Sequence, residues 1–222
     1  MADKKIFKPD NIMASSGREG SFFDDLNLPP AAADFLQTWY RHLLAAIAIL
    51  VVVILGWTFT KQFTAARADR ASEQLTMAMQ IENQAARAAA LEEVASSYRR
   101  TGAGIWSRIE IAHLAREAGE LEQAAQTYEE LLGIIPRQDP RQPMVKLNLA
   151  QVLSELGRDE RAAALYRELE NTPGFEAWGL LGSGEILARR GEEAAAAEKY
   201  RQVAGMENVA VLLREQAELR LR

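Results

Sequence analysis

The residues best suited to acid–base chemistry are glutamates, which occur as three adjacent pairs. These pairs are Glu92-Glu93, Glu129-Glu130 and Glu192-Glu193. Two carboxylates cooperate in catalysis only when they face a common reacting group, whereas neighbouring residues of a helix point in different directions. Each pair lies in a stretch of helical composition. The pairs therefore predict solvated helix surface and no acid–base site.

The other residues with chemical potential stand alone. His113 has no matched acid or nucleophile, and the second histidine, His42, lies in a different segment. The chain has no cysteine, which excludes disulfides, thiolate zinc sites, iron–sulfur clusters and cysteine nucleophiles. Gly179, Gly182 and Gly184 imitate a phosphate loop, but no strand precedes them and no Lys-Ser or Lys-Thr follows, so close helix packing explains them. We expect no enzyme, cofactor, metal site or small-molecule substrate; an enzyme with an unrecognised site is the alternative.

Charge divides the chain into three parts. The 222 residues carry 26 basic and 31 acidic side chains, a net charge of −5, so the chain as a whole lacks the basic excess used to bind nucleic acid. Residues 1–41 have a net charge of −1, residues 42–60 carry no charge, and residues 61–222 have a net charge of −4. The sequence therefore predicts a polar tail, an apolar span and a charged remainder.

The apolar span has the length of a membrane-crossing helix. His42 to Thr60 are 19 uncharged residues, which form a helix about 28 Å long, close to the thickness of a bilayer's hydrocarbon core. Arg41 and Lys61 bracket the span. Aromatic residues lie at both edges, as at membrane surfaces: Trp39, Tyr40, Trp57 and Phe59. We expect a single uncleaved anchor, because the preceding tail is far longer than the basic region of a signal peptide.

The orientation of this anchor is a balance of two signals. Lys61, Arg67 and Arg70 follow the span, and basic flanks favour the cytoplasmic side. That rule is weak for long domains, however, and the tail carries basic residues of its own. We expect the tail in the cytoplasm and the large domain outside, with the opposite orientation as the alternative.

Three blocks of the charged remainder align with one another. The blocks are Ile105–Pro136, Pro143–Pro173 and Ala177–Gly205. Residues of the same type recur in them at intervals of 38 and 34: Gly119, Gly157 and Gly191; Ala124, Ala162 and Ala196; Tyr128, Tyr166 and Tyr200. A unit of 34 residues with two helices is the period of a tetratricopeptide repeat, and the four extra residues fit the loop before Pro143.

The repeated residue types have physical roles in such a helix pair. The glycine ends the first helix in a left-handed cap, the alanine lies where the paired helices cross closely, and the tyrosine fills the gap to the next pair. Thr64–Gln84 and Ala86–Arg100 predict a further, degenerate pair. Val209–Leu219 predicts a capping helix with one apolar face formed by Leu212, Leu213, Ala217 and Leu219.

These elements together predict an all-α protein. We expect one transmembrane helix followed by a tetratricopeptide-repeat-like α-solenoid of about three clear repeats, a degenerate repeat and a capping helix. The expected domains are a polar, mostly disordered tail over 1–34, an anchor helix over 35–62 and the repeat domain over 63–222.

Two stretches carry a resemblance to a known family. These are Ile111–Ala124, with the sequence IAHLAREAGELEQA, and Lys146–Leu153, with the sequence KLNLAQVL. With its topology and these motifs, the chain resembles the bacterial family of single-span tetratricopeptide proteins that includes the ancillary subunit of the Sec translocon. The resemblance implies an adaptor in the inner membrane with a periplasmic repeat domain. It also implies protein or peptide partners, such as translocon subunits or periplasmic chaperones.

The resemblance further implies a partner-binding groove lined by the first helix of each pair. Carrying over the groove-facing repeat positions gives Trp106, Ile109, His113, Arg116 and Glu117 in the first block, Met144, Leu147, Gln151, Ser154 and Glu155 in the second, and Trp178, Leu181, Glu185, Ala188 and Arg189 in the third. The tryptophans share one repeat position and are either partner anchors or cement between repeats. The lysine and asparagine clamp for C-terminal carboxylates is absent, which favours a hydrophobic, mixed-charge peptide.

Overall fold

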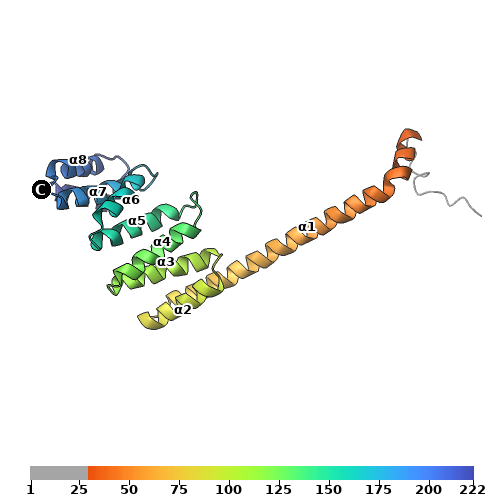
Figure 1. The fold of residues 1–222 in the computed structure, drawn as a ribbon, viewed down its shortest axis with the longest axis horizontal. Coiled ribbons are helices and arrows are strands. Elements are labelled where there is room, and N and C mark those ends of the chain that lie inside the picture. Colours follow the sequence, from red (N-terminus) through yellow and green to blue (C-terminus); the bar gives the residue numbers. More distant parts are fainter. Residues whose placement is uncertain (1–29) are drawn as a thin grey trace, which may run out of the picture. The chain divides into compact units, whose positions relative to one another are not determined.

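The computed structural model describes residues 30–222, which form α-helices joined by turns and loops and contain no strand (Figure 1). The helices are α1 (Pro30–Met79), α2 (Gln84–Ser97), α3 (Gly102–Glu117), α4 (Leu121–Ile134), α5 (Gln142–Glu155), α6 (Asp159–Glu170), α7 (Glu176–Arg189), α8 (Glu193–Ala204) and α9 (Val211–Arg220). The prediction of an all-α solenoid is confirmed. Most of the expected tail, residues 1–29, lies outside the described part.

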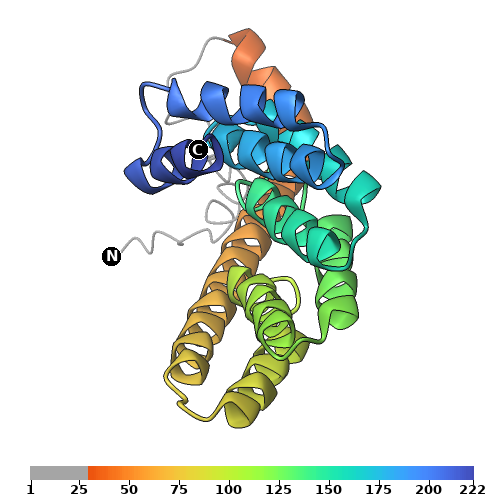
Figure 2. The ribbon, with the colours of Figure 1, turned by 90° about the vertical axis from the view of Figure 1, so that its left-hand side faces the viewer.

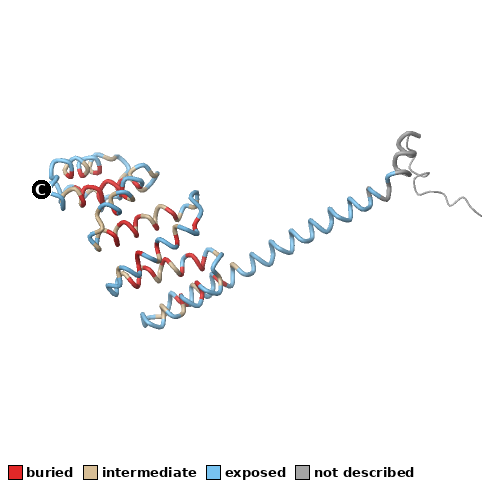
Figure 3. Tube along the Cα trace, in the orientation of Figure 1, coloured by how far each residue is buried: buried red, intermediate tan, exposed pale blue. Residues whose placement is uncertain are grey.

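The chain divides into two compact units, with the boundary between Phe63 and Thr64. The first unit contains the apolar part of α1. Among the described residues, Leu44–Met79 is the one helical segment long and apolar enough to cross a membrane, and its most apolar 18-residue window has a mean hydropathy of 2.2 and no buried residue (Figure 3). The hydroxyl of Thr58 donates to the carbonyl of Ile54 at 2.8 Å, so this polar group is satisfied within the helix.

The second unit is built from helix pairs that follow one another in chain order (Figure 2). The first helix of each clear pair ends at a glycine with a left-handed backbone: Gly119 (φ 80°), Gly157 (φ 69°) and Gly191 (φ 79°). At the first of these ends, Gly119 N–H donates to Arg116 O and Glu120 N–H donates to Ala115 O, which is the Schellman arrangement. The same two hydrogen bonds recur at the other two glycines. The predicted role of these glycines is confirmed.

The repeated alanines and tyrosines form the interior of the second unit. Their exposed fractions are at most 4%: Ala124, Ala162 and Ala196; Tyr128, Tyr166 and Tyr200. The largest hydrophobic cluster extends from α3 to α7, and a second cluster joins α7, α8 and α9. The last part of α1 packs on α2 and α3 through two small clusters, centred on Ala71 with Val94 and on Ala78 with Leu91. Apolar contacts in these four clusters thus hold successive pairs together.

The glycines of α7 are explained by close helix packing, as predicted. A Cβ added to Gly179 would lie 2.4 Å from the backbone N of Glu170. A Cβ on Gly182 would lie 2.2 Å from the ring of Tyr166, and one on Gly184 would lie 2.6 Å from the ring of Tyr200. Helix α7 is therefore glycine-rich because α6 and the two tyrosines occupy the space that side chains would need.

The prediction that one face of α9 is apolar and packs on the last repeat is confirmed for two of its four residues and wrong for the other two. Leu213 and Ala217 are buried, as expected. Leu212 and Leu219, however, are 72% and 65% exposed. Helical residues turn by about 100° each, so the (i, i+4) pair Leu213 and Ala217 faces α7 and α8, while the (i, i+7) pair Leu212 and Leu219 shares a different side. The capping helix therefore shows apolar side chains to solvent.

Candidate partner-binding surface

The residues expected to line the groove come from α3, α5 and α7, and we call the surface that these three helices form the first-helix face. Three of the expected residues are buried: Ile109 is 0% exposed, Leu147 is 8% exposed and Leu181 is 4% exposed. Ile109 and Leu147 belong to the large hydrophobic cluster and Leu181 to the second cluster. This part of the expectation is corrected: the three side chains hold the repeats together and offer no surface to a partner.

Both tryptophans, in contrast, are accessible. Trp106 is 39% exposed in the first turns of α3, and Trp178 is 37% exposed at the corresponding place in α7. A partner anchor must keep such an exposed surface, whereas a residue that only cements repeats would be covered. Trp178 also borders a cleft of about 630 Å³ that continues over Val209 and Leu213 toward α9.

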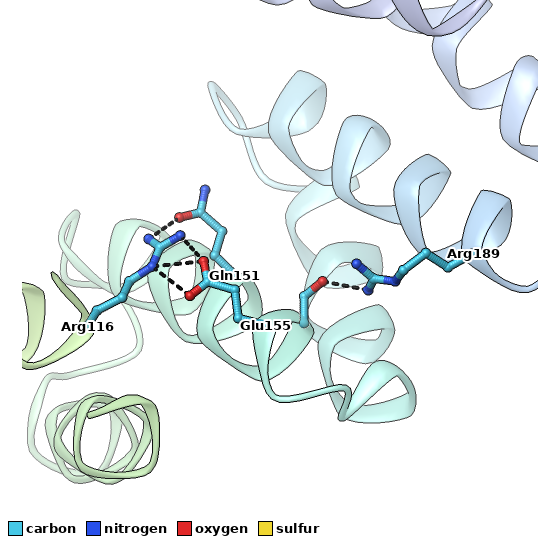
Figure 4. A network of polar contacts seen from close by, with 5 residues as sticks. Arg116, Gln151, Glu155 and Arg189 are labelled. Carbon is cyan, nitrogen blue, oxygen red and sulfur yellow. Dashed lines mark hydrogen bonds and ion pairs between the residues drawn. The ribbon is translucent and has the colours of Figure 1, made fainter. Parts of the chain in front are cut away.

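The charged residues of the first-helix face are joined across repeats by hydrogen bonds (Figure 4). Arg116 of α3 donates from Nη1 to Gln151 Oε1 at 2.9 Å and from Nε to Glu155 Oε1 at 3.0 Å, both on α5. Arg189 of α7 donates to Ser154 Oγ on α5 at 2.6 Å. We call this set, with the contacts described next, the arginine ladder.

The arginine ladder continues to the neighbouring helices. Arg189 also pairs with Asp159 of α6 at 2.6 Å, and Arg220 of α9 pairs with Glu185 of α7 at 3.0 Å. The partners on neighbouring first helices lie 35 to 39 residues apart, about one repeat period. A donor and an acceptor about one repeat period apart on successive first helices are the signal that could have identified the ladder from the sequence. Four of the expected partner-binding residues therefore already form a hydrogen bond or ion pair with a neighbouring repeat or with α9: Arg116, Gln151, Glu185 and Arg189.

Each contact of the ladder is modest in energy. The Arg116 and Glu155 side chains keep 31% and 41% of their surface exposed, and exposed pairs contribute about 0.2–1 kcal/mol each. Water and salt reach these groups, so a partner's polar groups can compete for them. The ladder thus links neighbouring repeats and still presents charges of both signs on the first-helix face.

The repeat tyrosines bring neutral hydroxyls close to this face. Burial raises the pKa of Tyr166 to about 12, with the nearby Glu185 acting in the same direction. Burial likewise raises the pKa of Tyr128 far above its ordinary value, and its hydroxyl has no hydrogen-bond partner among the described residues. The ring of His113 lies 6.0 Å from that of Tyr128, and its Nδ1 lies 3.9 Å from Glu110 Oε2. This arrangement contains no nucleophile beside a base.

The surface also lacks the elements of a metal site. Within the described residues, no group of three or more histidines, aspartates and glutamates is placed to hold a metal ion. Met144 is half-buried beside the large cluster, and His113 and Gln151 are likewise partly exposed. The first-helix face therefore combines two exposed aromatic side chains with a hydrogen-bonded, mixed-charge floor, which suits recognition of a peptide.

Comparison with known proteins bears on the fold. The sequence profile of the tetratricopeptide repeat-like domain family matches residues 33–221. No curated protein matches the sequence. A crystal structure of a tetratricopeptide repeat protein from Parabacteroides merdae ATCC 43184 matches with a TM-score of 0.56 and 14% sequence identity, over 70% of this chain and 59% of that chain. The match thus spans about three fifths of the other protein's length and shows a likeness of fold alone.

Proposed function

Because this chain belongs to the tetratricopeptide repeat-like domain family, we propose that it is a non-enzymatic, membrane-anchored scaffold that binds protein partners on its first-helix face. Solenoids of this type expose extended surfaces for protein–protein interaction. The observation that carries the proposal is the pair Trp106 and Trp178, which occupy one repeat position and are both more than one third exposed. Aromatic side chains of this kind are enriched among the energetically dominant residues of interfaces.

The anchor part of the proposal rests on α1. Large apolar side chains from Leu44 to Phe59 are exposed, and a protein in water would bury them. Lys61 Nζ lies 5.3 Å from the ring centroid of Trp57, a pairing typical of the headgroup region. The domain organisation proposed is a tail over 1–34, an anchor over 35–62 and the repeat domain over 63–222.

The partners proposed are envelope proteins that offer hydrophobic, mixed-charge segments. The exposed tryptophans supply apolar anchors, and the arginine ladder supplies donors and acceptors of both signs. The order of tail, span and repeats supports an inner-membrane adaptor with a periplasmic repeat domain, acting with translocon subunits or periplasmic chaperones. The same adaptor with the repeat domain in the cytoplasm is the competing topology.

Reporter fusions at Arg222 separate the two topologies. A periplasmic repeat domain gives alkaline phosphatase activity in the phosphatase fusion and no activity in the β-galactosidase fusion. The reverse pattern assigns the domain to the cytoplasm and refutes the periplasmic topology. A fusion protein recovered in the soluble fraction, without membranes, refutes the anchor itself.

Crosslinking in living cells tests the binding surface. A photoreactive amino acid at Trp106 or Trp178 is expected to capture the same protein, because both positions lie on the first-helix face. The matched control is Gln126, an exposed residue of α4. Capture of equal strength from Gln126 would show that the first-helix face is not the preferred surface. Mass spectrometry of the captured protein identifies the partner.

A further inference from the structure

The side chains of the arginines in the repeat unit fall into three groups. Eight of them form ion pairs with carboxylates, as Arg116 does with Glu155 and Arg161 with Glu129. Four others donate to backbone carbonyls: Arg67, Arg87, Arg167 and Arg214. The side chains of the remaining six form neither an ion pair nor a hydrogen bond with any described residue: Arg70, Arg99, Arg100, Arg108, Arg137 and Arg222. The chain has a net charge of −5, so a cluster of unpaired arginines would form a local positive patch on an otherwise acidic protein.

Three of these six, Arg99, Arg100 and Arg108, gather around one cavity of about 780 Å³. It lies between the end of α2, the beginning of α3 and the connection from α4 to α5, and we call it the basic pocket. Arg99, Arg100, Arg108 and Arg141 contribute its basic lining. Its single carboxylate is Asp139, which accepts hydrogen bonds from Arg141 at 2.6 and 2.9 Å. Asp139 thus compensates the charge of Arg141, whereas no carboxylate in the pocket lining compensates Arg99, Arg100 and Arg108.

The basic pocket adjoins residues that contact the last part of α1, within the same unit. Arg67 donates from Nη2 to the carbonyl of Ser97 at 2.7 Å, and its guanidinium lies 5.7 Å from the ring centroid of Tyr98. The chain passes directly from these residues into Arg99. Arg67 follows the last span residue, Thr60, by seven positions, which corresponds to roughly 10 Å as a helix and about 25 Å for a fully extended chain.

Membrane topology alone does not account for these charges. Basic residues influence orientation when they lie within about 15–20 residues of a span. Arg67 and Arg70 satisfy this condition, but Arg99 lies 39 positions beyond Thr60, and Arg108 lies still farther along the chain. Within the second unit, the contacts of Arg67 with the end of α2 hold the distant arginines near the last part of α1.

We propose that the basic pocket binds the phosphate headgroups of anionic phospholipids and so docks the repeat unit on the membrane that its anchor crosses. The inference rests on the membrane anchorage proposed above. Guanidinium groups match phosphate oxygens with paired N–H donors. Ile134, which is 51% exposed at the pocket, adds an apolar contact. An anionic membrane surface repels the rest of the repeat unit, which is acidic. The repeat unit is therefore expected to approach the membrane with the basic pocket.

The absence of cysteine allows a direct test. In the full chain, Ile134→Cys carries a fluorophore at the pocket, and the protein is reconstituted into nanodiscs of phosphatidylcholine with or without phosphatidylglycerol. Both discs contain a lipid with a nitroxide headgroup as quencher. We expect severalfold stronger quenching in the anionic discs. The difference should vanish at about 1 M salt, where the Debye length is about 3 Å.

Two controls isolate the pocket. The variant R99Q/R100Q/R108Q should lose the lipid-dependent quenching, whereas R158Q/R161Q/R201Q, which removes the same charge at paired arginines, should keep it. The same fluorophore on Leu212→Cys in α9, which is 72% exposed, should be quenched weakly and equally in both discs.

The outcomes separate this inference from the anchorage. Equal quenching of the Ile134→Cys label in both discs, or equal loss in the two triple variants, overturns the docking while incorporation into the discs still supports the anchor. Failure of the chain to incorporate overturns the anchor and the docking with it. A response of the label to added oligoglutamate, without a response to phosphatidylglycerol, assigns the pocket to an acidic peptide and overturns the lipid proposal.

Discussion

At the scale of single residues, the smallest side chains decide how closely the helices approach. Gly179 has the backbone of α6 against it, with Glu170 N and Tyr166 O only 2.4 and 2.7 Å from where a Cβ would stand. Gly133, in α4, has nothing within 4 Å of the same point. Two glycines in helices of one fold therefore serve opposite purposes, because one makes room for a neighbouring backbone and the other only loosens its helix.

This difference predicts opposite effects of one substitution. Gly179→Ala should destabilise the protein, because overpacking against backbone costs about 1–3 kcal/mol and the atoms in the way cannot rotate aside. Gly133→Ala should stabilise it by up to about 1 kcal/mol through helix propensity. Thermal unfolding of the full chain in mild detergent, followed by circular dichroism, measures both. Equal shifts of the two variants in the same direction would refute the tight approach of α6 and α7.

The buried tyrosines predict how the fold responds to alkali. The pKa of Tyr166 is about 12 in the folded chain against an ordinary 10.0. The unfolded state therefore releases its proton first, so stability is complete below about pH 10 and is lost as the pH rises toward 12. Tyrosinate absorbance and circular dichroism should change together in this window, and Tyr166→Phe should move the change upward. Ionisation of all tyrosines near pH 10 with intact helicity would contradict the burial.

At the scale of helices, periodic residue types suffice to predict α3 to α8. The glycine that ends the first helix, the alanine at the close crossing and the tyrosine between pairs each recur once per helix pair. Which side of a helix is covered depends instead on the approach of its neighbours. Ile109 and Leu147 occupy groove-facing positions by sequence, yet both are buried in the hydrophobic cluster that extends from α3 to α7. Likewise, the link from Arg116 to Glu155 depends on how consecutive pairs stack, which no single helix encodes.

The helix ends provide a prediction at this scale. Gly157 ends α5 with a φ of 69°, a backbone that residues with a Cβ adopt at a cost of roughly 1–2 kcal/mol. Gly157→Ala should therefore lower the unfolding temperature, although no atom lies within 4 Å of the added Cβ. Gly157→Asn should cost less, because asparagine tolerates the left-handed region. The same detergent-solubilised chain serves for the measurement, and equal stability of the wild type and the alanine variant would exclude the left-handed cap.

At the scale of the whole molecule, the repeat unit carries two surfaces of different chemistry. The first-helix face offers tryptophans and charges that are already joined to one another, whereas the basic pocket offers charges that no described residue compensates. A peptide with apolar side chains suits the first surface and a layer of phosphates suits the second. Because Trp106 and Arg108 both belong to α3, a single helix contributes to both surfaces. Variants of the two residues should therefore separate partner binding from lipid docking.

The tryptophans give the prediction that tests the scaffold as a whole. If Trp106 and Trp178 anchor a partner, truncation of either to alanine should weaken capture by about 2 kcal/mol or more, near thirtyfold, with a much smaller change in stability. A tryptophan that only cements repeats would instead cost about 3–5 kcal/mol of folding free energy. Denaturant midpoints of the solubilised chain and capture of the crosslinked partner by each variant distinguish these outcomes. Unfolding of both variants would reject the anchor interpretation, and unchanged folding with unchanged capture would move the interaction to another surface, such as the exposed Leu212 and Leu219 of α9.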